Sequence, residues 1–401
     1  MKYFYLLKNL KKIRFNLQYK KIVIFDGYSL VHLKFVLEGQ KYFILEDRKE
    51  NIDTLYITPS VIFNFVKYFS LIFKKYSLKV IYSIAVIKAI KPKILITAID
   101  NSINFFLISK ALKNSVFCLA IQNNGRASHA DIETHYIKKN VLLQKNYKDL
   151  YYIPNYVCFG QVVADSCTRQ NLTIENVYQY GAIQIGNFYQ YVKKKNIRLN
   201  KNLYDICFIS EPGIDTRVDK FAKIIKLLKF SIKISIQNNL KFIFVSKFSE
   251  NLENFPNLKT KDYYISEINF YKKNLNKQEF EYLILNMNIK KNIYSSHMAL
   301  FQSSLGIGVQ SSLLYYKMSC KEKILACNFT NETVFDFPIK GICSMKNPNY
   351  KDFKSRVKMI FSLNTDEYLK RMNKDPQYYI NFDSKENVID KIKQLIKNNL
   401  D

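Results

Sequence analysis

The stretch "FQSSLGIGVQSSLLYYKM" at residues 301–318 differs in composition from the rest of the chain. Its first twelve positions hold four serines and two glycines, although the whole sequence of 401 residues has only 10 glycines. The preceding "HMALF" (297–301) predicts a strand, "QSSLGIG" a turn, and "VQSSLLYYKM" the start of a helix. A helix that begins after such a turn presents unpaired amides and a positive dipole end, which favour a phosphate. The alternative is a tight strand-to-helix connection with serine caps.

Outside this stretch, short apolar runs alternate with longer helical patterns, which is typical of parallel α/β sheets. In the first half, the expected strands cover residues 21–27, 42–47, 93–100, 116–122, 156–160 and 177–181. In the second half, they cover residues 204–210, 241–247, 297–301 and 323–329. The expected helices include one that begins at Pro59 with Thr58 as its N-cap, and others at 101–113, 217–239, 352–372 and from 387 onward.

The polar and basic run at residues 191–202 is the best candidate for a linker. A chain of this length usually forms more than one domain. We therefore expect two Rossmann-like domains, at residues 1–195 and 203–401.

The net charge of +29 narrows the classes of partner. Lysine provides most of this charge, because only eight of the 62 basic residues are arginines. Arginine is the side chain suited to bidentate recognition of bases and phosphates. We therefore expect no nucleic-acid partner, and an anionic lipid surface or a phosphorylated substrate fits the charge at least as well.

The cysteines and histidines predict neither a metal site nor a disulfide framework. The seven cysteines include no C-x-x-C pair, and the four histidines lack the spacing of metal ligands. An odd number of cysteines without a framework favours a reducing cytoplasm, and the first residues lack the features of a secretory signal. Basic residues beside apolar ones near the N-terminus favour peripheral contact with the inner membrane; they are Lys8, Lys11, Lys12 and Arg14.

The segment "HMALFQSSLGIGVQSSLLYYKMSCKEKILACNF" (297–329) resembles the nucleotide-sugar segment of GT-B glycosyltransferases, especially those of bacterial surface-carbohydrate (capsule and lipopolysaccharide) biosynthesis. "ITAIDNSINFFLISKAL" (96–112), "AIQNNGR" (120–126) and "DFKSRVKMIFSLNTDEYLKRM" (352–372) are similar to further stretches of the same proteins. The resemblance implies a GT-B-like α/β fold with two Rossmann-like domains facing across a cleft. The first domain would bind the acceptor and the second the nucleotide sugar, and the last helix is a candidate for packing back on the first domain.

One position departs from the pattern of this family. The family turn carries a glutamate that is expected to hold the ribose hydroxyls of the nucleotide, whereas the aligned residue here is Gly308. Gln310, two residues later, is the polar side chain available for a ribose hydroxyl. It lacks the charge that strengthens such contacts, so the identity of the nucleotide stays open.

The second half supplies the candidates for donor binding. Ser210, Glu211 and Gly213 follow its first strand, where this fold usually approaches the donor diphosphate. Because a carboxylate repels phosphate, Glu211 is expected to face the sugar or the base. Lys247 ends the next strand and either neutralises the departing phosphate or is an ordinary surface lysine. The expected donor-binding residues are Ser210, Glu211, Gly213, Ser303, Ser304, Leu305, Gly306, Gln310 and Ser311.

The first half supplies the candidates for catalysis and acceptor binding. Asp100 follows a strand at its carboxyl end, where open α/β sheets place ligand groups, and is either a general base or the N-cap of the next helix. His129 is either a second candidate base or a solvated loop histidine. Arg126 either holds an anionic acceptor or pairs with a nearby surface carboxylate. The expected acceptor-binding residues are Asn101, Asn124 and Arg126.

Together these features predict a cytoplasmic glycosyltransferase that transfers a sugar from a nucleotide-sugar donor to a surface-polysaccharide or lipid-linked acceptor. No metal is needed if positive groups and helix amides stabilise the departing diphosphate, and no cofactor is expected beside the donor. A polyol-phosphate transferase and a nucleotide-sugar epimerase are the alternatives among enzymes of this fold. A catalytically silent subunit of a polysaccharide assembly complex is the alternative from another class, and Gly308 favours it.

Overall fold

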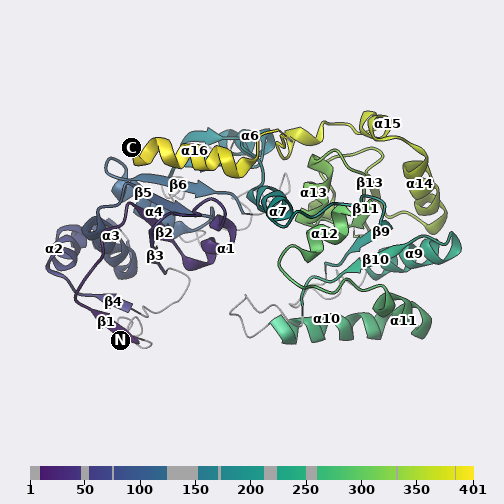
Figure 1. Cartoon of the computed structure of the whole chain (residues 1–401), viewed down its shortest axis with the longest axis horizontal. Coiled ribbons are helices and arrows are strands. Elements are labelled where there is room, and N and C mark those ends of the chain that lie inside the picture. The colour runs from purple at the N-terminus through teal and green to yellow at the C-terminus, as the bar shows by residue number, and fades with distance from the viewer. Residues whose placement is uncertain are drawn as a thin grey trace. The chain divides into compact units, whose positions relative to one another are not determined.

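A computed structural model describes residues 10–46, 54–74, 76–123, 152–169, 173–211, 224–249, 260–330, 333–383 and 385–401. The chain divides into two compact units (Figure 1). Unit 1 comprises Met1–Arg126, Ala130–Gln190 and Asn381–Asp401, and unit 2 comprises Tyr191–Ile380 together with Ala127–His129, which lies outside the described residues. The chain therefore leaves unit 1 inside helix α7 (Ile183–Lys194), which extends into the predicted linker, and returns to unit 1 after residue 380.

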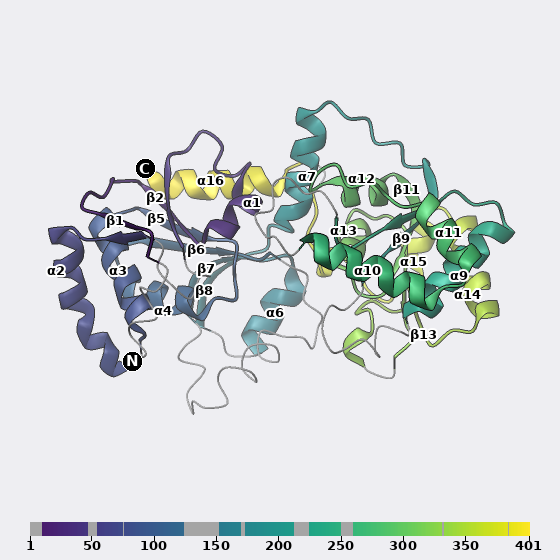
Figure 2. The same cartoon turned by 90° about the horizontal axis from the view of Figure 1, so that it is seen from below.

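Within the described part of unit 1, six parallel strands form one sheet. Their order is β3 (Tyr42–Leu45), β2 (Ile22–Phe25), β5 (Ile94–Thr97), β6 (Phe117–Ile121), β7 (Tyr152–Val157) and β8 (Thr173–Tyr178). The central strands are almost wholly apolar and buried, as expected when helices cover both faces of a parallel sheet. In Figures 1 and 2, β5 and β6 run between α16 (Val388–Leu400) and α4 (Ile103–Leu112).

An outer pair of helices completes unit 1 beside a short parallel pair of strands, β1 (Lys12–Arg14) and β4 (Thr54–Tyr56). α2 (Pro59–Tyr68) continues as the 3-10 helix η3 (Phe69–Lys74), and α2 packs on α3 (Leu78–Ile90). The predicted start of α2 is confirmed, because the side chain of Thr58 accepts a hydrogen bond from the amide of Val61 at 3.2 Å and Pro59 is the first helical residue.

Five parallel strands form the sheet in the described part of unit 2. Their order is β10 (Phe242–Val245), β9 (Tyr204–Ile209), β11 (Ser303–Gly308), β12 (Ile324–Asn328) and β13 (Ser344–Lys346). The chain runs from β9 outward to β10 and then crosses to β11 on the other side of β9. The strand order thus reverses between β9 and β11, and it reverses between β2 and β5 in unit 1. These two parallel sheets confirm the predicted fold class at the level of two Rossmann-like α/β units, while the cleft stays a prediction.

Two of the three elements predicted around residues 301–318 are wrong, and the helix predicted after them is confirmed as α13 (Ser312–Ser319). Residues 297–301 belong to helix α12 (Ser295–Phe301), and the residues expected to turn form strand β11. The small residues serve close packing, since a Cβ atom on Gly306 would lie 2.9 Å from Leu300 Cδ1 and 3.2 Å from Lys317 Cδ. Leu300 belongs to α12 and Lys317 to α13 (Ser312–Ser319), so helices on either side of β11 in sequence approach its bare backbone.

Other elements differ from the predictions in smaller ways. β7 and β8 begin at Tyr152 and Thr173, several residues before the expected strands. The expected helix at 352–372 is two helices, α14 (Tyr350–Ser362) and α15 (Thr365–Lys370), each begun by an asparagine N-cap. Strand β13 was not predicted, because three partly exposed residues carry almost no periodic signal. No helix among the described residues has the length and hydrophobicity needed to cross a membrane.

Candidate functional site

The candidate site lies in unit 2 at the carboxyl ends of β9 and β11, where the strand order reverses. Open α/β sheets bind ligands at such a reversal. β9 is followed by Ser210 and Glu211, and β11 is followed by a short turn that leads to Ser311, the N-cap of α13. The side chain of Ser311 accepts a hydrogen bond from the amide of Leu313 at 3.4 Å. Segments about a hundred residues apart in the chain therefore meet at the carboxyl edge of the sheet, beside its inner strands β9 and β11.

At this edge of the sheet, backbone amides donate hydrogen bonds to a carboxylate of the protein itself. The oxygens of Glu211 accept hydrogen bonds from the amide of Gln310 at 3.0 and 3.2 Å, and from the amides of Val309 and Ser311. Burial raises the pKa of Glu211, while these amides and the Lys247 ammonium act in the opposite direction. Amides at a helix N-terminus bind anions, and here the anion is a side chain. The expected contact between phosphate and the Gln310 amide is therefore not available in this conformation.

Glu211 also lies beside the position where the family resemblance leads us to expect a glutamate. A Cβ atom on Gly308 would lie 3.5 Å from Glu211 Oε1. The same atom would lie 3.2 Å from Leu314 Cδ1, so the start of α13 packs tightly on the end of β11. A carboxylate therefore lies beside residue 308, on the segment that follows the neighbouring strand β9.

Ser210 is buried, and its side chain contacts other side chains of the protein instead of an open surface. Its buried Oγ lies 2.5 Å from Glu267 Oε1 and 2.5 Å from the Tyr271 hydroxyl, both on α10 (Thr260–Asn274). Glu267 also accepts hydrogen bonds from the amides of Lys247 at 2.9 Å and Phe248 at 3.0 Å. Burial raises the pKa of Glu267. This network joins the ends of β9 and β10 to α10 and fixes the floor of the site.

Two lysines lie at the end of β10. Lys247 is exposed, its Nζ lies 5.6 Å from the centroid of the Phe248 ring, and its charge lowers the pKa of Glu211. Lys290 Nζ donates a hydrogen bond to the backbone carbonyl of Lys247 at 3.0 Å. Burial lowers the pKa of Lys290 to about 8. Positive charge is therefore available beside the carboxylate at neutral pH.

The side of the site toward β12 contains groups that the sequence did not reveal. Gln310 Nε2 donates to the backbone carbonyl of Asp336 at 3.4 Å, and Asn328 Nδ2 donates to Asp336 Oδ1 at 2.6 Å. Burial opposes the ionised form of Asp336, but the bond from Asn328 and the charges of Lys340 and Lys346 prevail and lower its pKa. Asn328 is the last residue of the run "KILACN" and of β12, so a polar side chain at the end of an apolar strand was the available signal.

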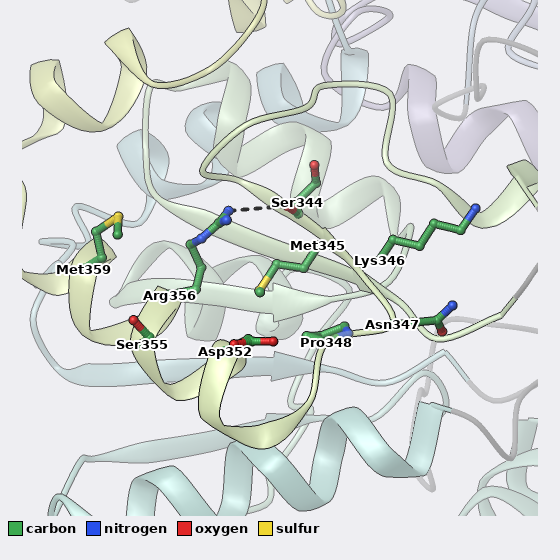
Figure 3. Close-up of a pocket in the computed structure, with 9 residues that line it drawn as sticks. All are labelled: Ser344, Met345, Lys346, Asn347, Pro348, Asp352, Ser355, Arg356 and Met359. Carbon is green, nitrogen blue, oxygen red and sulfur yellow. Dashed lines mark hydrogen bonds between the residues drawn. The ribbon is translucent and has the colours of Figure 1, made fainter.

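Beyond β12, a cavity of about 530 Å³ lies at the end of β13 and the start of α14. Figure 3 shows Met345 and Met359 beside polar groups of Asp352, Ser355 and Arg356. The Arg356 guanidinium donates to the backbone carbonyls of Gly341 at 2.8 Å, Ile342 at 3.1 Å and Ser344 at 3.4 Å, so it holds the cavity wall. The volume of this cavity is in the range of ligand pockets, and the cavity lies two strands away from β11.

In unit 1, Asp100 lies beyond the end of β5 and is fully buried. Its Oδ2 accepts a hydrogen bond from the Tyr156 hydroxyl at 2.8 Å. The alternative role as an N-cap is wrong, because Ser102 caps α4 by accepting a bond from the amide of Phe105 at 3.3 Å. Asn101 is partly exposed, and nothing in the structure tests its predicted contact with an acceptor.

The structure brings some of the predicted site residues together and separates others. One group of them lies together at the carboxyl ends of β9, β10 and β11; it consists of Glu211, Lys247, Gln310 and Ser311. The residues predicted to form a phosphate-binding turn lie instead in β11, where the strand pairs with β9 and β12; they are Ser303, Ser304, Leu305 and Gly306. Asn124, Arg126, His129 and Gly213 lie outside the described residues, so their roles stay predictions.

Comparison with known proteins finds likeness only among solved structures. No protein-family model matches the sequence, and no curated protein matches it. UDP-GlcNAc 2-epimerase from Methanocaldococcus jannaschii, in complex with UDP-GlcNAc and UDP, aligns over 96% of this chain and 99% of its own, at 13% identity and a TM-score of 0.49. The wall teichoic acid polymerase TagF aligns over 95% and 88%, at 10% identity and a TM-score of 0.49.

Sucrose-phosphate synthase from Thermosynechococcus elongatus aligns over 98% of this chain and 95% of its own, at 9% identity and a TM-score of 0.41. At these TM-scores the similarities carry no argument about activity. The fold is established by the two parallel sheets described above.

Proposed function

We propose that the chain is a GT-B glycosyltransferase that takes a sugar from a nucleotide-sugar donor and transfers it to a surface-polysaccharide or lipid-linked acceptor. One observation supports this proposal most directly: the Glu211 carboxylate, the Gln310 side chain and the Lys247 ammonium lie together where the strand order of unit 2 reverses. This is the place where sheets of this kind bind nucleotides. The sequence resemblance to nucleotide-sugar enzymes falls on the same segment.

In this proposal Glu211 holds the nucleotide ribose. An ionised carboxylate has about four acceptor positions, and the amide of Gln310 reaches both oxygens of Glu211. A ribose hydroxyl can donate to another of these positions, and the Gln310 side chain can contact the second hydroxyl. The diphosphate then lies away from the carboxylate, on the side of Lys247, because like charges repel.

The reaction would be a displacement at the anomeric carbon. An acceptor hydroxyl attacks this carbon, its proton passes to a base, and the bond from the carbon to the diphosphate oxygen breaks. Asp100 and His129 stay the two predicted bases, and Lys247 stabilises the charge that develops on the departing diphosphate. The proposal uses no cofactor and no metal beyond these groups. An acceptor at the cytoplasmic side of a bacterial membrane, as in capsule or lipopolysaccharide synthesis, is the finer form of the proposal.

Nucleotide binding tests the donor site. In isothermal titration calorimetry against CMP, CDP, UDP and GDP, we expect one diphosphate to bind and the Glu211→Gln variant to bind it at least about tenfold more weakly, because it loses a charge-assisted hydrogen bond. The matched control is Glu279→Gln, which alters another carboxylate of unit 2 that accepts a backbone amide, in the capping box of α11 (Lys277–Leu285). Equal affinity of wild type and Glu211→Gln, or no binding of any nucleotide, contradicts the proposal.

A catalytically silent subunit of a polysaccharide assembly complex is the second candidate. The complete burial of Asp100 favours it, because a general base must reach the proton that it removes. If the protein transfers the sugar of the bound donor, or slowly hydrolyses that donor, it is an enzyme. Binding without turnover, also in the presence of acceptor extracts, would decide for the silent subunit.

A further inference from the structure

Within the part of the chain that the structure describes, the outer helices of unit 1 leave an apolar surface exposed. Val61 is buried, and Phe65 and Tyr68 are partly buried, on the side of α2 that packs on α3. The outer apolar surface, as we name it, consists of Ile62, Phe63, Val66, Phe69 and Phe73 of α2 and η3. Phe63 and Val66 are each 68% exposed and Phe73 is 87% exposed. Single exposed apolar side chains are ordinary, but a contiguous group of this kind marks an interaction site.

The spacing of these residues makes them one strip. Ile62, Val66 and Phe69 stand at positions i, i+4 and i+7, which share one face of a helix, and Phe73 continues the strip into η3. In Figures 1 and 2, α2 lies at the periphery of unit 1, with α3 between it and the sheet. The strip therefore faces away from the core of unit 1.

The stretch of chain that forms α2, η3 and α3 carries charge of one sign. Residues 54–99 contain seven lysines and neither an aspartate nor a glutamate. Lys67 and Lys74 belong to the same two helices as the strip. Aromatic and aliphatic side chains beside lysines are the composition of helices that lie in the interface of an anionic bilayer.

We propose that α2 and η3 bind the surface of an anionic phospholipid bilayer, with the outer apolar surface inserted among the acyl chains and the lysines at the headgroups. A second copy of the chain fits less well, because a symmetric contact through this face would bring the same lysines together. A nucleic acid would satisfy the lysines but would leave Ile62 and Val66 without apolar partners. The two helices are too short to cross the bilayer, so they lie in its interface.

This inference is independent of glycosyl transfer, since it concerns unit 1 and needs no nucleotide. The test is cosedimentation of the full chain with vesicles of phosphatidylcholine alone, or mixed with phosphatidylglycerol, at low and high salt. We expect binding to the mixed vesicles that weakens with salt, and little binding to phosphatidylcholine. The double variant Phe63→Ser/Phe73→Ser should lose at least about tenfold in partitioning, because two aromatic rings no longer enter the bilayer.

The matched control changes two equally exposed apolar residues of unit 2, Leu285→Ser/Ile289→Ser, which are 84% and 78% exposed. It should bind vesicles as the wild type does. Thermal melting of both variants verifies that they fold. Equal loss in both variants, or no loss in Phe63→Ser/Phe73→Ser, overturns the proposal. So does a dimer in light scattering that this double variant converts to a monomer without any change in vesicle binding.

Discussion

At the scale of single residues, the structure gives Glu211 a contact that its charge did not reveal. A carboxylate next to an expected phosphate site predicted a contact with the sugar or base. In the structure, three backbone amides bind this carboxylate, although residue 211 lies about a hundred positions before them. The sequence marks Glu211 as the residue after a strand, but only the pairing of β9 with β11 brings it to the start of α13. Its role as a ribose ligand stays a prediction.

The buried His297 should make the free energy of unfolding of the protein depend on pH. Burial, and the charge of Lys290, lower the pKa of His297 from 6.5 to about 4, and its ring stacks on Tyr316 with 6.0 Å between centroids. Between pH 6.5 and pH 4, His297 binds a proton in the unfolded chain but stays neutral in the folded chain. His297 therefore stabilises the fold less as pH falls from 6.5 toward 4, by roughly 2 to 3 kcal/mol at the low end.

The difference between wild type and His297→Phe isolates this effect. Urea unfolding at pH 7, 5.5 and 4 should show that the free energy of unfolding of the wild type falls more steeply than that of the variant. Buried carboxyl groups titrate in both proteins and cancel in the difference. Parallel pH profiles of the two proteins would show that His297 titrates in the folded state as it does in the unfolded chain.

At the scale of elements, β11 shows how packing decides what a run of small residues becomes. Ser303 donates its hydroxyl proton to the backbone carbonyl of Leu300 at 2.6 Å, which ends α12. The buried Lys317 of α13 donates to the carbonyls of Leu300 at 2.9 Å and Ser303 at 2.8 Å, and pairs with Glu322 at 2.7 Å. These bonds fix both helices on the strand, and the bare backbone of Gly306 lets them approach.

Substitution at Gly306 should therefore destabilise unit 2. Gly306→Val places new carbon atoms against Leu300 and Lys317, and overpacking of this kind costs about 1 to 3 kcal/mol. Ser304→Val is the control, because Ser304 lies on the same strand and is partly exposed, and its hydroxyl donates to Asn202 Oδ1 at 3.3 Å on the exposed side. Urea unfolding followed by circular dichroism measures both. A Gly306→Val variant as stable as the wild type would mean that the two helices can move apart without cost.

At the scale of the whole molecule, the end of the chain completes the first unit. Asn381 donates its amide proton to the carbonyl of Phe159 at 2.7 Å, and α16 then packs against β5. Ile389 and Ile392 of α16 are fully buried. Lys93, just before β5, donates to the carbonyls of Leu400 at 2.5 Å and Asp401 at 3.0 Å. Residues 381–401 therefore stabilise a sheet whose strands lie between residues 22 and 178.

A cavity created beside α16 should consequently destabilise unit 1 and leave the stability of unit 2 unchanged. Ile392→Ala removes buried methyl groups and should cost about 2 to 5 kcal/mol, whereas the exposed Gln394→Ala should change little. Hydrogen exchange measured by mass spectrometry reads the units separately. We expect faster exchange in β5 and β6 and unchanged exchange in β9 and β11. Faster exchange in both units would show that they unfold together.

The sequence by itself determined the α/β class, most strands and several helix starts, because apolar runs and capping residues act through neighbours in the chain. Thr58 before Pro59 and the apolar strands β2, β5, β9 and β12 needed no distant partner to be recognised. Only the tertiary structure decided that residues 303–308 form a strand and that Glu211 occupies the amides after it. Small residues fit a turn and a tightly packed strand equally well locally. The hydrogen bonds and helix contacts that choose between them come from residues far apart in the sequence.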